Sequence, residues 1–265
     1  MLRGAPLSKN GLTVSRISLG LAHVHLMTPA QRSGLINTAL DLGITHFDTS
    51  RFYSDGLSEQ VLGTVLGKRR QHVTITTKFG LLPTSIIGRM GPAAPVGRKL
   101  RSALVRLKLV QYPRQLYTPA LLHRSLATSL KALGTDYVDV LAIHEPAGAA
   151  SLTDELIEAL IAVRASGMAR CIGVAGDMIE SVVDRWGDVL DVFQTAEGTW
   201  ENTRFLPDFT YSLFSSGRGR GEAPLSQSEI DQRLAKALAR RPNGAVIIQT
   251  RNPERLRRYV EIAAQ

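Results

Sequence analysis

Four side chains suited to proton transfer follow short apolar runs in this sequence. Asp48 ends the run ITHFD, Tyr53 comes five residues later, Lys78 ends VTITTK, and His144 ends YVDVLAIH. A carboxylate and a phenol delivered together suggest a proton donor with a supporting charge. Each residue alone has an ordinary explanation, such as a loop hydrogen bond or core packing. Gln194 also follows a strand-like run. Because these residues share this position, we expect them to lie together in one site.

The elements that must position these residues alternate between strand and helix patterns. A hairpin is predicted over 8–20, with its turn at Asn10 and Gly11, and it leads into a first strand. Further strands are predicted up to Asp48 and over 73–78, 137–144, 169–176, 189–195, 209–214 and 244–250, with helices over 30–42, 57–67, 118–133, 152–166, 178–186, 226–242 and 252–264. This alternation predicts parallel strands, and eight of them suggest a closed (β/α)8 barrel whose strand ends share one rim. The crossover over 196–208 is short for a helix.

Composition sets the outer limits. The chain has 265 residues, 44% of them hydrophobic, which suits one barrel domain over 1–265. A single cysteine, Cys171, excludes an intramolecular disulfide and fits a reducing compartment. The sequence has no run of about 18 apolar residues and no secretory signal, so we expect no membrane span and a cytoplasmic location.

The net charge of +9 is concentrated in one segment. The seven cations at 89, 98, 99, 101, 106, 108 and 114 have no acidic neighbour between them, and the rest of the chain is near +2 (9 minus 7). They belong to a basic insertion, residues 81–117, which follows the strand that ends at Lys78. The insertion is interpreted as a lid that packs Leu100, Leu104 and Leu107 on the barrel, with a solvated loop as the alternative. Because aromatic residues are not interleaved with the charges, no nucleic-acid partner is expected.

Two segments carry a resemblance to a known family. FDTSRFYSDGLSE (47–59) and SLATSLKALGTDYVDVLAIHEP (125–146) resemble the signatures of the aldo-keto reductase superfamily. The opening NGLTVSRISLGLA, RCIGVAGD, TYSLFSS and IIQTRNPERL are similar to further family segments, so the resemblance covers nearly the whole chain. It implies a (β/α)8 barrel closed at its base by an N-terminal hairpin. It also implies an extended nicotinamide cofactor, NADP(H) with NAD(H) possible, bound without a glycine-rich fingerprint.

The resemblance implies a role for each candidate residue. Tyr53 would protonate a carbonyl oxygen as hydride arrives, Lys78 would lower the pKa of Tyr53, Asp48 would hold Lys78, and His144 would orient the substrate. Gln194 would bind the nicotinamide carboxamide and Tyr211 would stack on the ring. The remaining cofactor-binding positions are Ser212, Thr250, Arg251 and Arg255, of which Thr250 and Arg255 match those that hold the adenosine phosphate.

Departures from the family pattern keep alternatives open. Ala175-Gly176-Asp177 stands where many relatives have a Ser-Asn pair for the carboxamide, and Gln249 stands where some have Lys. The favoured function is NADPH-dependent reduction of a small aldehyde or ketone. The alternatives are an NAD(P)-dependent alcohol or sugar dehydrogenase and a regulatory module with little turnover. A monomer without a metal is expected.

Overall fold

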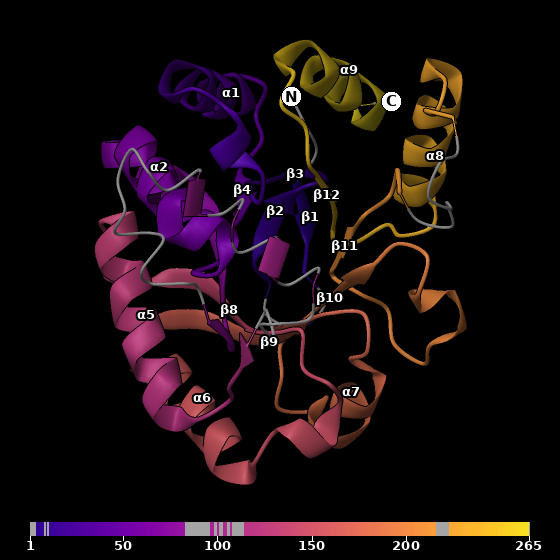
Figure 1. Ribbon diagram of the computed structural model, residues 1–265. Coiled ribbons are helices and arrows are strands. Elements are labelled where there is room, and N and C mark those ends of the chain that lie inside the picture. Colours follow the sequence, from indigo (N-terminus) through magenta and orange to yellow (C-terminus); the bar gives the residue numbers. More distant parts are fainter. Residues whose placement is uncertain are drawn as a thin grey trace.

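Eight parallel strands form a closed barrel in the computed structural model, ringed by helices (Figure 1). The structure describes residues 4–7, 9, 11–82, 96–97, 100, 103–104, 107, 114–215 and 223–264. Around the barrel the order is β10-β11-β12-β3-β4-β5-β8-β9. The strands are β3 (Ile17–Gly20), β4 (His46–Asp48), β5 (Thr74–Phe79), β8 (Val138–His144), β9 (Ala169–Ala175), β10 (Val192–Ala196), β11 (Phe209–Tyr211) and β12 (Ala245–Ile248). The predicted (β/α)8 fold is confirmed.

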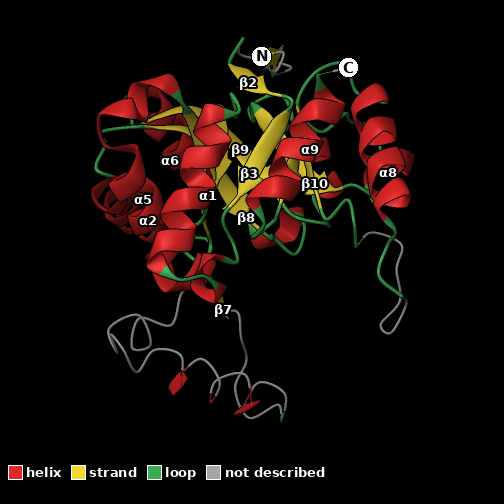
Figure 2. Cartoon of the chain, turned by 90° about the horizontal axis from the view of Figure 1, so that it is seen from above, coloured by secondary structure: helices red, strands yellow, loops and turns green. Residues whose placement is uncertain are grey.

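The helices pack around the outside of the strands, as the view from above shows (Figure 2). They are α1 (Pro29–Asp41), α2 (Leu57–Leu66), α5 (Pro119–Leu133), α6 (Asp154–Ala165), α7 (Glu180–Trp186), α8 (Gln227–Ala239) and α9 (Pro253–Ala263). Local sequence determines their ends. The Thr118 side chain accepts a hydrogen bond from the backbone N–H of Leu121 at the start of α5, and Gly134 ends that helix in the left-handed conformation.

A short antiparallel pair lies at the base of the barrel, where the strands begin. β1 (Gly4–Pro6) pairs with β2 (Thr13–Ser15), so the hairpin starts earlier than the predicted 8–20. Leu7 and Val14 pack against the lower interior of the barrel, which includes Val140 and Phe209. In Figure 2, β2 lies at one end of the molecule and β7 (Arg114–Gln115) at the other. The hairpin therefore covers the end of the barrel opposite the strands' carboxyl ends.

The crossover between β10 and β11 contains only a short 3-10 helix, Trp200–Asn202, which fits the shortness expected of residues 196–208. A buried ion pair lies near this part of the wall: Arg241 Nη2 is 3.4 Å from Glu197 Oε2. The same nitrogen donates to Thr210 Oγ1 on β11 at 2.6 Å. Polar side chains thus contact the outer face of β11 next to a crossover that lacks a full helix.

Most of the basic insertion lies outside the described residues, including much of the predicted basic helix. The leucines of its predicted packing face are described: Leu100 and Leu107 are 62% and 64% exposed and Leu104 is half-buried, so the prediction that this face packs on the barrel is wrong at Leu100 and Leu107. What the structure describes is its neck, in which β6 (Leu81–Leu82) pairs antiparallel with β7. No helix within the described ranges is long and apolar enough to cross a membrane.

Candidate active site

A buried ion pair lies at the carboxyl ends of β4 and β5. Strand alternation turns Asp48 and Lys78 toward the inside of the barrel. Lys78 Nζ donates to Asp48 Oδ1 at 2.5 Å and to the backbone oxygen of Thr49 at 3.0 Å, and each side chain is 1% exposed. Burial lowers the pKa of Lys78, while Asp48 acts against that shift. The carboxylate therefore offsets part of the cost of burying the ammonium and fixes it in place.

Tyr53 lies directly beside this ion pair. Its hydroxyl is 3.4 Å from Lys78 Nζ, and the ammonium is 4.8 Å from the centre of its ring. The expectation that the pKa of Tyr53 is lowered overall is wrong for this structure. Burial raises the pKa of Tyr53 well above its usual value, and the nearby Asp48 and Glu145 carboxylates add to the effect. The phenol therefore keeps its proton at neutral pH.

His144, at the end of β8, completes the group of four predicted catalytic residues. Its ring meets that of Tyr53 edge-on, with centroids 5.5 Å apart. Its Nδ1 is 3.2 Å from Ser50 Oγ, which also accepts from the backbone N–H of Phe52 at 3.1 Å. Burial, with the charge of Lys78, lowers the pKa of His144 well below its usual value. The ring is neutral, and within the described part of the chain no partner bonds its Nε2.

The loop that carries Tyr53 is held in an uncommon backbone conformation. Ser54 and Asp55 have φ values of 56° and 58°, in the left-handed region. Ser54 Oγ lies 2.8 Å from His25 Nδ1 and donates to the backbone oxygen of Ala22 at 3.2 Å. The loop after β3 thus fixes the loop after β4, which keeps the phenol at the mouth of the barrel.

Gln194 and Tyr211 approach the same mouth from β10 and β11. Gln194 is 3% exposed, and its side-chain amide makes no hydrogen bond to any residue that the structure describes. An amide at the mouth that no described residue bonds is available to a polar group of a ligand, as donor and as acceptor. The Tyr211 hydroxyl donates to Asp177 Oδ1 at 2.5 Å and lies 3.4 Å from Glu145 Oε1.

Glu145 is a mouth residue that the sequence reasoning missed. It follows His144 directly and has a left-handed backbone, with φ at 51°. Its carbonyl accepts hydrogen bonds of 2.7 Å from both Gln115 Nε2 and the Tyr117 hydroxyl. Burial and the neighbouring Asp177 raise the pKa of Glu145. A Glu just after a strand is normally solvated, so only the unusual backbone reveals this inward position.

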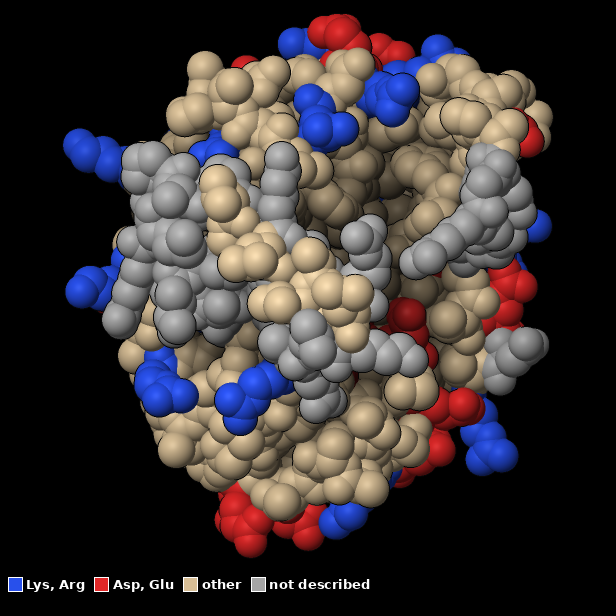
Figure 3. All heavy atoms as spheres, viewed as in Figure 1, with Lys and Arg blue, Asp and Glu red and all other residues tan. Residues whose placement is uncertain are grey.

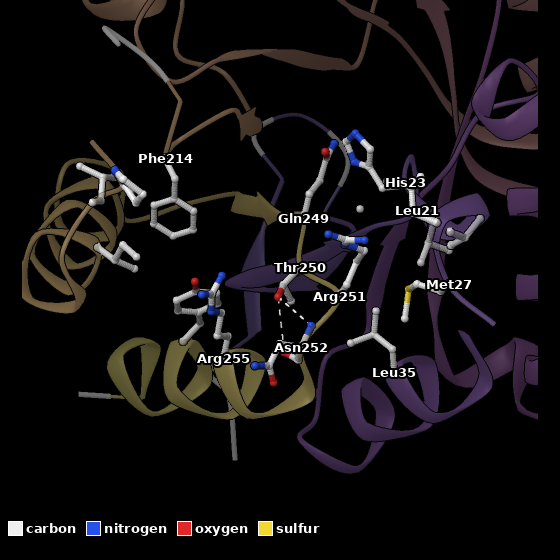
Figure 4. Close-up of a pocket in the computed structure, with 17 residues that line it drawn as sticks. Leu21, His23, Met27, Leu35, Phe214, Gln249, Thr250, Arg251, Asn252 and Arg255 are labelled. Atoms are coloured by element: carbon white, nitrogen blue, oxygen red, sulfur yellow. Dashed lines mark hydrogen bonds between the residues drawn. The ribbon is translucent and has the colours of Figure 1, made fainter. Parts of the chain in front are cut away.

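A cavity of about 790 Å³ opens beside the mouth, between the segments that follow β3 and β12 (Figure 4). Thr250, Arg251 and Arg255 line it on the α9 side, and His23 lines it from the segment after β3. Ser212 is an exposed residue in a left-handed conformation (φ 59°) and is not among the lining residues. The structure therefore places three of the predicted cofactor-binding residues in one cavity, while Ser212 does not line it.

The charges on this face are separated. Figure 3 shows Lys and Arg atoms at the upper margin of the central hollow, towards the start of α9 in Figure 1, and acidic atoms at its lower right. A cationic margin suits a phosphate, while the acidic part lies towards the barrel mouth. In the described ranges no group of three or more His, Cys, Asp or Glu side chains is placed to hold a metal ion.

Comparison with known proteins identifies the family. The sequence profile of the Aldo/keto reductase family matches residues 16–187. A probable voltage-gated potassium channel subunit beta from Oryza sativa subsp. japonica is 27% identical over 185 residues, 68% of this chain and 48% of that protein. Pyridoxal 4-dehydrogenase from Microbacterium luteolum is 32% identical over 145 residues, 52% of this chain and 42% of that enzyme. The chain spans about half the length of the curated relatives it matches.

Solved structures share the fold over the whole chain. The holo form of an aldo-keto reductase from Bacillus halodurans has a TM-score of 0.75 and 17% identity, and it covers 100% of this chain and 92% of its own. An aldo-keto reductase from Klebsiella pneumoniae in complex with NADPH has a TM-score of 0.71 and 18% identity, covering 100% and 91%. This chain belongs to the aldo/keto reductase family.

Proposed function

We propose that this chain is an NADPH-dependent oxidoreductase that reduces an aldehyde or ketone to an alcohol, with Tyr53 as the general acid. The observation that carries the proposal is the line of contacts from Asp48 through Lys78 to the Tyr53 hydroxyl, with neutral His144 against the Tyr53 ring. Asp48, Lys78 and His144 lie at the carboxyl ends of strands and Tyr53 lies on the loop that follows β4, which is the end of the barrel where barrel enzymes have their active sites.

The protonated phenol of Tyr53 supports this role. Bound NADPH would supply the hydride, which brings two electrons and one hydrogen to the carbonyl carbon. Tyr53 gives the matching proton to the carbonyl oxygen and becomes a phenolate. Lys78 Nζ, 3.4 Å from the phenol oxygen, is placed to stabilise that negative charge as it forms. Lys78 therefore acts on the charge of the transition state, while the resting phenol stays protonated.

His144 is suited to orient the substrate oxygen. Because Ser50 Oγ already accepts from Phe52, its own hydrogen can be donated to His144 Nδ1. That arrangement leaves a proton on Nε2, which can donate to a carbonyl oxygen. The hydrogen bond fixes the carbonyl beside Tyr53, whose proton then has a short path to the oxygen.

The residues present fit a nicotinamide dinucleotide in two places. The side-chain amide of Gln194, which no described residue bonds, would bond the carboxamide beside Tyr211, and the cavity near α9 would take the adenosine end. Arg251 and Arg255 line that cavity, and guanidinium groups bind phosphate by charge-assisted hydrogen bonds. This supports NADP(H) over NAD(H), with Thr250 beside the same phosphate. Gln249, which also lines the cavity, adds no charge to this preference.

Binding and turnover test the proposal separately. Purified protein titrated with NADPH should show saturable quenching of protein fluorescence. NADPH absorbance should then fall when a panel of aldehydes and ketones is supplied. A protein that binds NADPH but oxidises it with none of the panel would contradict the reductase assignment.

Two other candidate functions have support from the relatives. Pyridoxal 4-dehydrogenase and the D-threo-aldose 1-dehydrogenase of a Pseudomonas species, 28% identical over 187 residues, favour oxidation of an alcohol or sugar on the same site. The potassium channel subunit beta relatives favour the second alternative, a regulatory module. Turnover that is faster with NADP⁺ and an alcohol than with NADPH and a carbonyl would support the dehydrogenase. Tight binding of the nucleotide with negligible turnover in both directions would support the regulatory module. A single domain, a monomer and a cytoplasmic location stay predictions from the sequence.

A further inference from the structure

Glu145 and Gly176 fit together as a matched pair at the barrel mouth. A side chain at position 176 would begin 3.1 Å from both Cα and Oε2 of Glu145, closer than most such contacts. Because Gly176 has no side chain, the backbone and carboxylate of Glu145 can occupy this space. Glu145 holds this inward position at the cost of a left-handed backbone, and two hydrogen bonds to its carbonyl fix it there.

The space is used to bring two carboxylates to one phenol. The Tyr211 hydroxyl donates to Asp177 and lies next to Glu145, and their charges raise the pKa of Tyr211 after the larger effect of burial. Lys78, a cation whose charge acts on Glu145, is already paired with Asp48. The charge of the Glu145–Asp177 pair therefore has no dedicated counter-ion among the side chains that the structure describes in the mouth.

The cofactor itself supplies a cation in one redox state. The nicotinamide ring is positively charged when oxidised and neutral when reduced. A ring stacked on Tyr211 would be attracted to the face of the phenol, and hydrogen bonds to carboxylates increase the electron density of that face. The carboxylates also attract the positive ring directly, in a site with little water to screen the charge.

We propose that Glu145 and Asp177, through the phenol of Tyr211, stabilise the oxidised nicotinamide and so tighten NADP⁺ binding relative to NADPH binding. The proposal rests on the proposed function, because it requires the cofactor at this mouth. Both residues are positioning and electrostatic groups in it, and Tyr53 remains the proton donor. By stabilising the product form of the cofactor, the pair would make bound NADPH a stronger hydride donor.

The experiment compares two dissociation constants in the same protein. NADPH and NADP⁺ are each titrated into the parent and into Glu145→Gln and Asp177→Asn, with binding followed by calorimetry. Both substitutions keep an acceptor for Tyr211 and remove a charge. We expect the Kd of NADP⁺ to rise about five- to tenfold with a small change for NADPH, as for the loss of a partly screened charge a few ångströms away. Circular dichroism confirms that each variant is folded.

Glu180→Gln is the matched control. Glu180 is an exposed carboxylate three residues beyond Asp177, at the start of α7, and it makes no contact with Tyr211. It should leave the ratio of the two constants unchanged. An equal change of both constants in Glu145→Gln and Asp177→Asn would mean a purely structural role and would overturn the inference, as would an unchanged ratio. A parent that binds neither nucleotide would overturn the proposed function, and this inference with it.

Discussion

Two buried histidines, His46 and His144, show how one residue type serves two layers of the same barrel. His46 lies in the lower layer, with Nδ1 2.8 Å from Thr74 Oγ1 and Nε2 3.1 Å from Thr76 Oγ1. Its ring stacks on Phe209 with centroids 4.4 Å apart. Both of its nitrogens are used within the protein. His144 lies in the upper layer, at the mouth, and uses only Nδ1, towards Ser50.

Burial lowers the pKa of both rings and keeps both neutral, so charge does not distinguish them. They differ in whether one ring nitrogen is left without a hydrogen-bond partner in the protein. Burial, with a smaller effect of Lys78, lowers the pKa of His46 to about 3. A His with both nitrogens bonded contributes to packing and stability. A neutral His with one free nitrogen can bond a substrate. The lower layer of the barrel should therefore control stability, and the mouth should control chemistry.

Tyr53→Phe is the strongest test of the mouth. We expect carbonyl reduction to fall by roughly 10²- to 10⁴-fold, because the proton donor is lost. The Kd of NADPH should stay close to that of the parent, because only the transition state uses the hydroxyl. Steady-state kinetics and a nucleotide titration measure the two quantities. Full activity in this variant would remove Tyr53 from the chemistry.

Glutamine at each histidine tests the comparison directly. His144→Gln should lower turnover by about tenfold or more with a small change in stability, because the substrate loses its orienting donor. His46→Gln should lower the free energy of unfolding by about 1–3 kcal/mol, because at least one threonine hydroxyl loses its buried partner. Urea unfolding and kcat are measured for both variants. Matching losses of kcat in the two would break the distinction between the layers.

Acid should destabilise the protein partly through His46. The unfolded chain takes up a proton near pH 6.5, while the folded ring resists it down to about pH 3, so stability falls as the pH falls through this window. Between pH 6.5 and 5 this residue should account for a loss of roughly 1.5 kcal/mol. The His46→Gln variant should show a correspondingly weaker dependence in urea unfolding. Parallel curves for the parent and the variant would show that His46 is protonated in the folded state.

Arg255→Ala should have the smallest effect of these substitutions. It should change neither the stability set by the lower layer nor the chemistry at the mouth. Arg255 is an exposed residue on α9, so its contact with an adenosine phosphate would be partly screened by water. We expect the preference for NADPH over NADH to narrow about fivefold, with kcat and stability unchanged. Arg257→Ala is the control, since Arg257 lies on the same helix and does not line the cavity. Equal affinities for NADPH and NADH in the parent would contradict the assignment before any substitution is made.

The sequence was most informative where local chemistry decides the structure. Thr118 and Gly134 gave the ends of α5 at the right residues because capping depends on a few neighbours. The eight strands were predictable for a similar reason, although β11 ends at Tyr211 instead of residue 214. The spacing of Asp48 and Lys78 placed both side chains at one rim, and the structure brings them to 2.5 Å.

Sequence reasoning failed for properties of a side chain that depend on residues distant in the sequence. The pKa of Tyr53 goes up because of burial and the carboxylates of Asp48 and Glu145, and no local pattern encodes that sum. Glu145 points inward because its backbone is left-handed and Gly176 makes room, which requires two segments to be compared in space. Most of the predicted lid lies outside the described residues and stays a prediction, but Leu100 and Leu107 are described and are exposed instead of packed on the barrel.

The paired neck of the basic insertion allows the length of the chain to change at this position. Leu81 pairs with Gln115 and Leu82 with Arg114, so the residues that flank the segment 83–113 are held together at one place. Doubling the length of such a loop costs only about 0.6 kcal/mol in closure entropy. Gln115 also donates to the carbonyl of Glu145, so the neck is anchored to the segment that follows His144. Evolution or an engineer can therefore exchange the loop as a module, provided that the paired residues of the neck are kept.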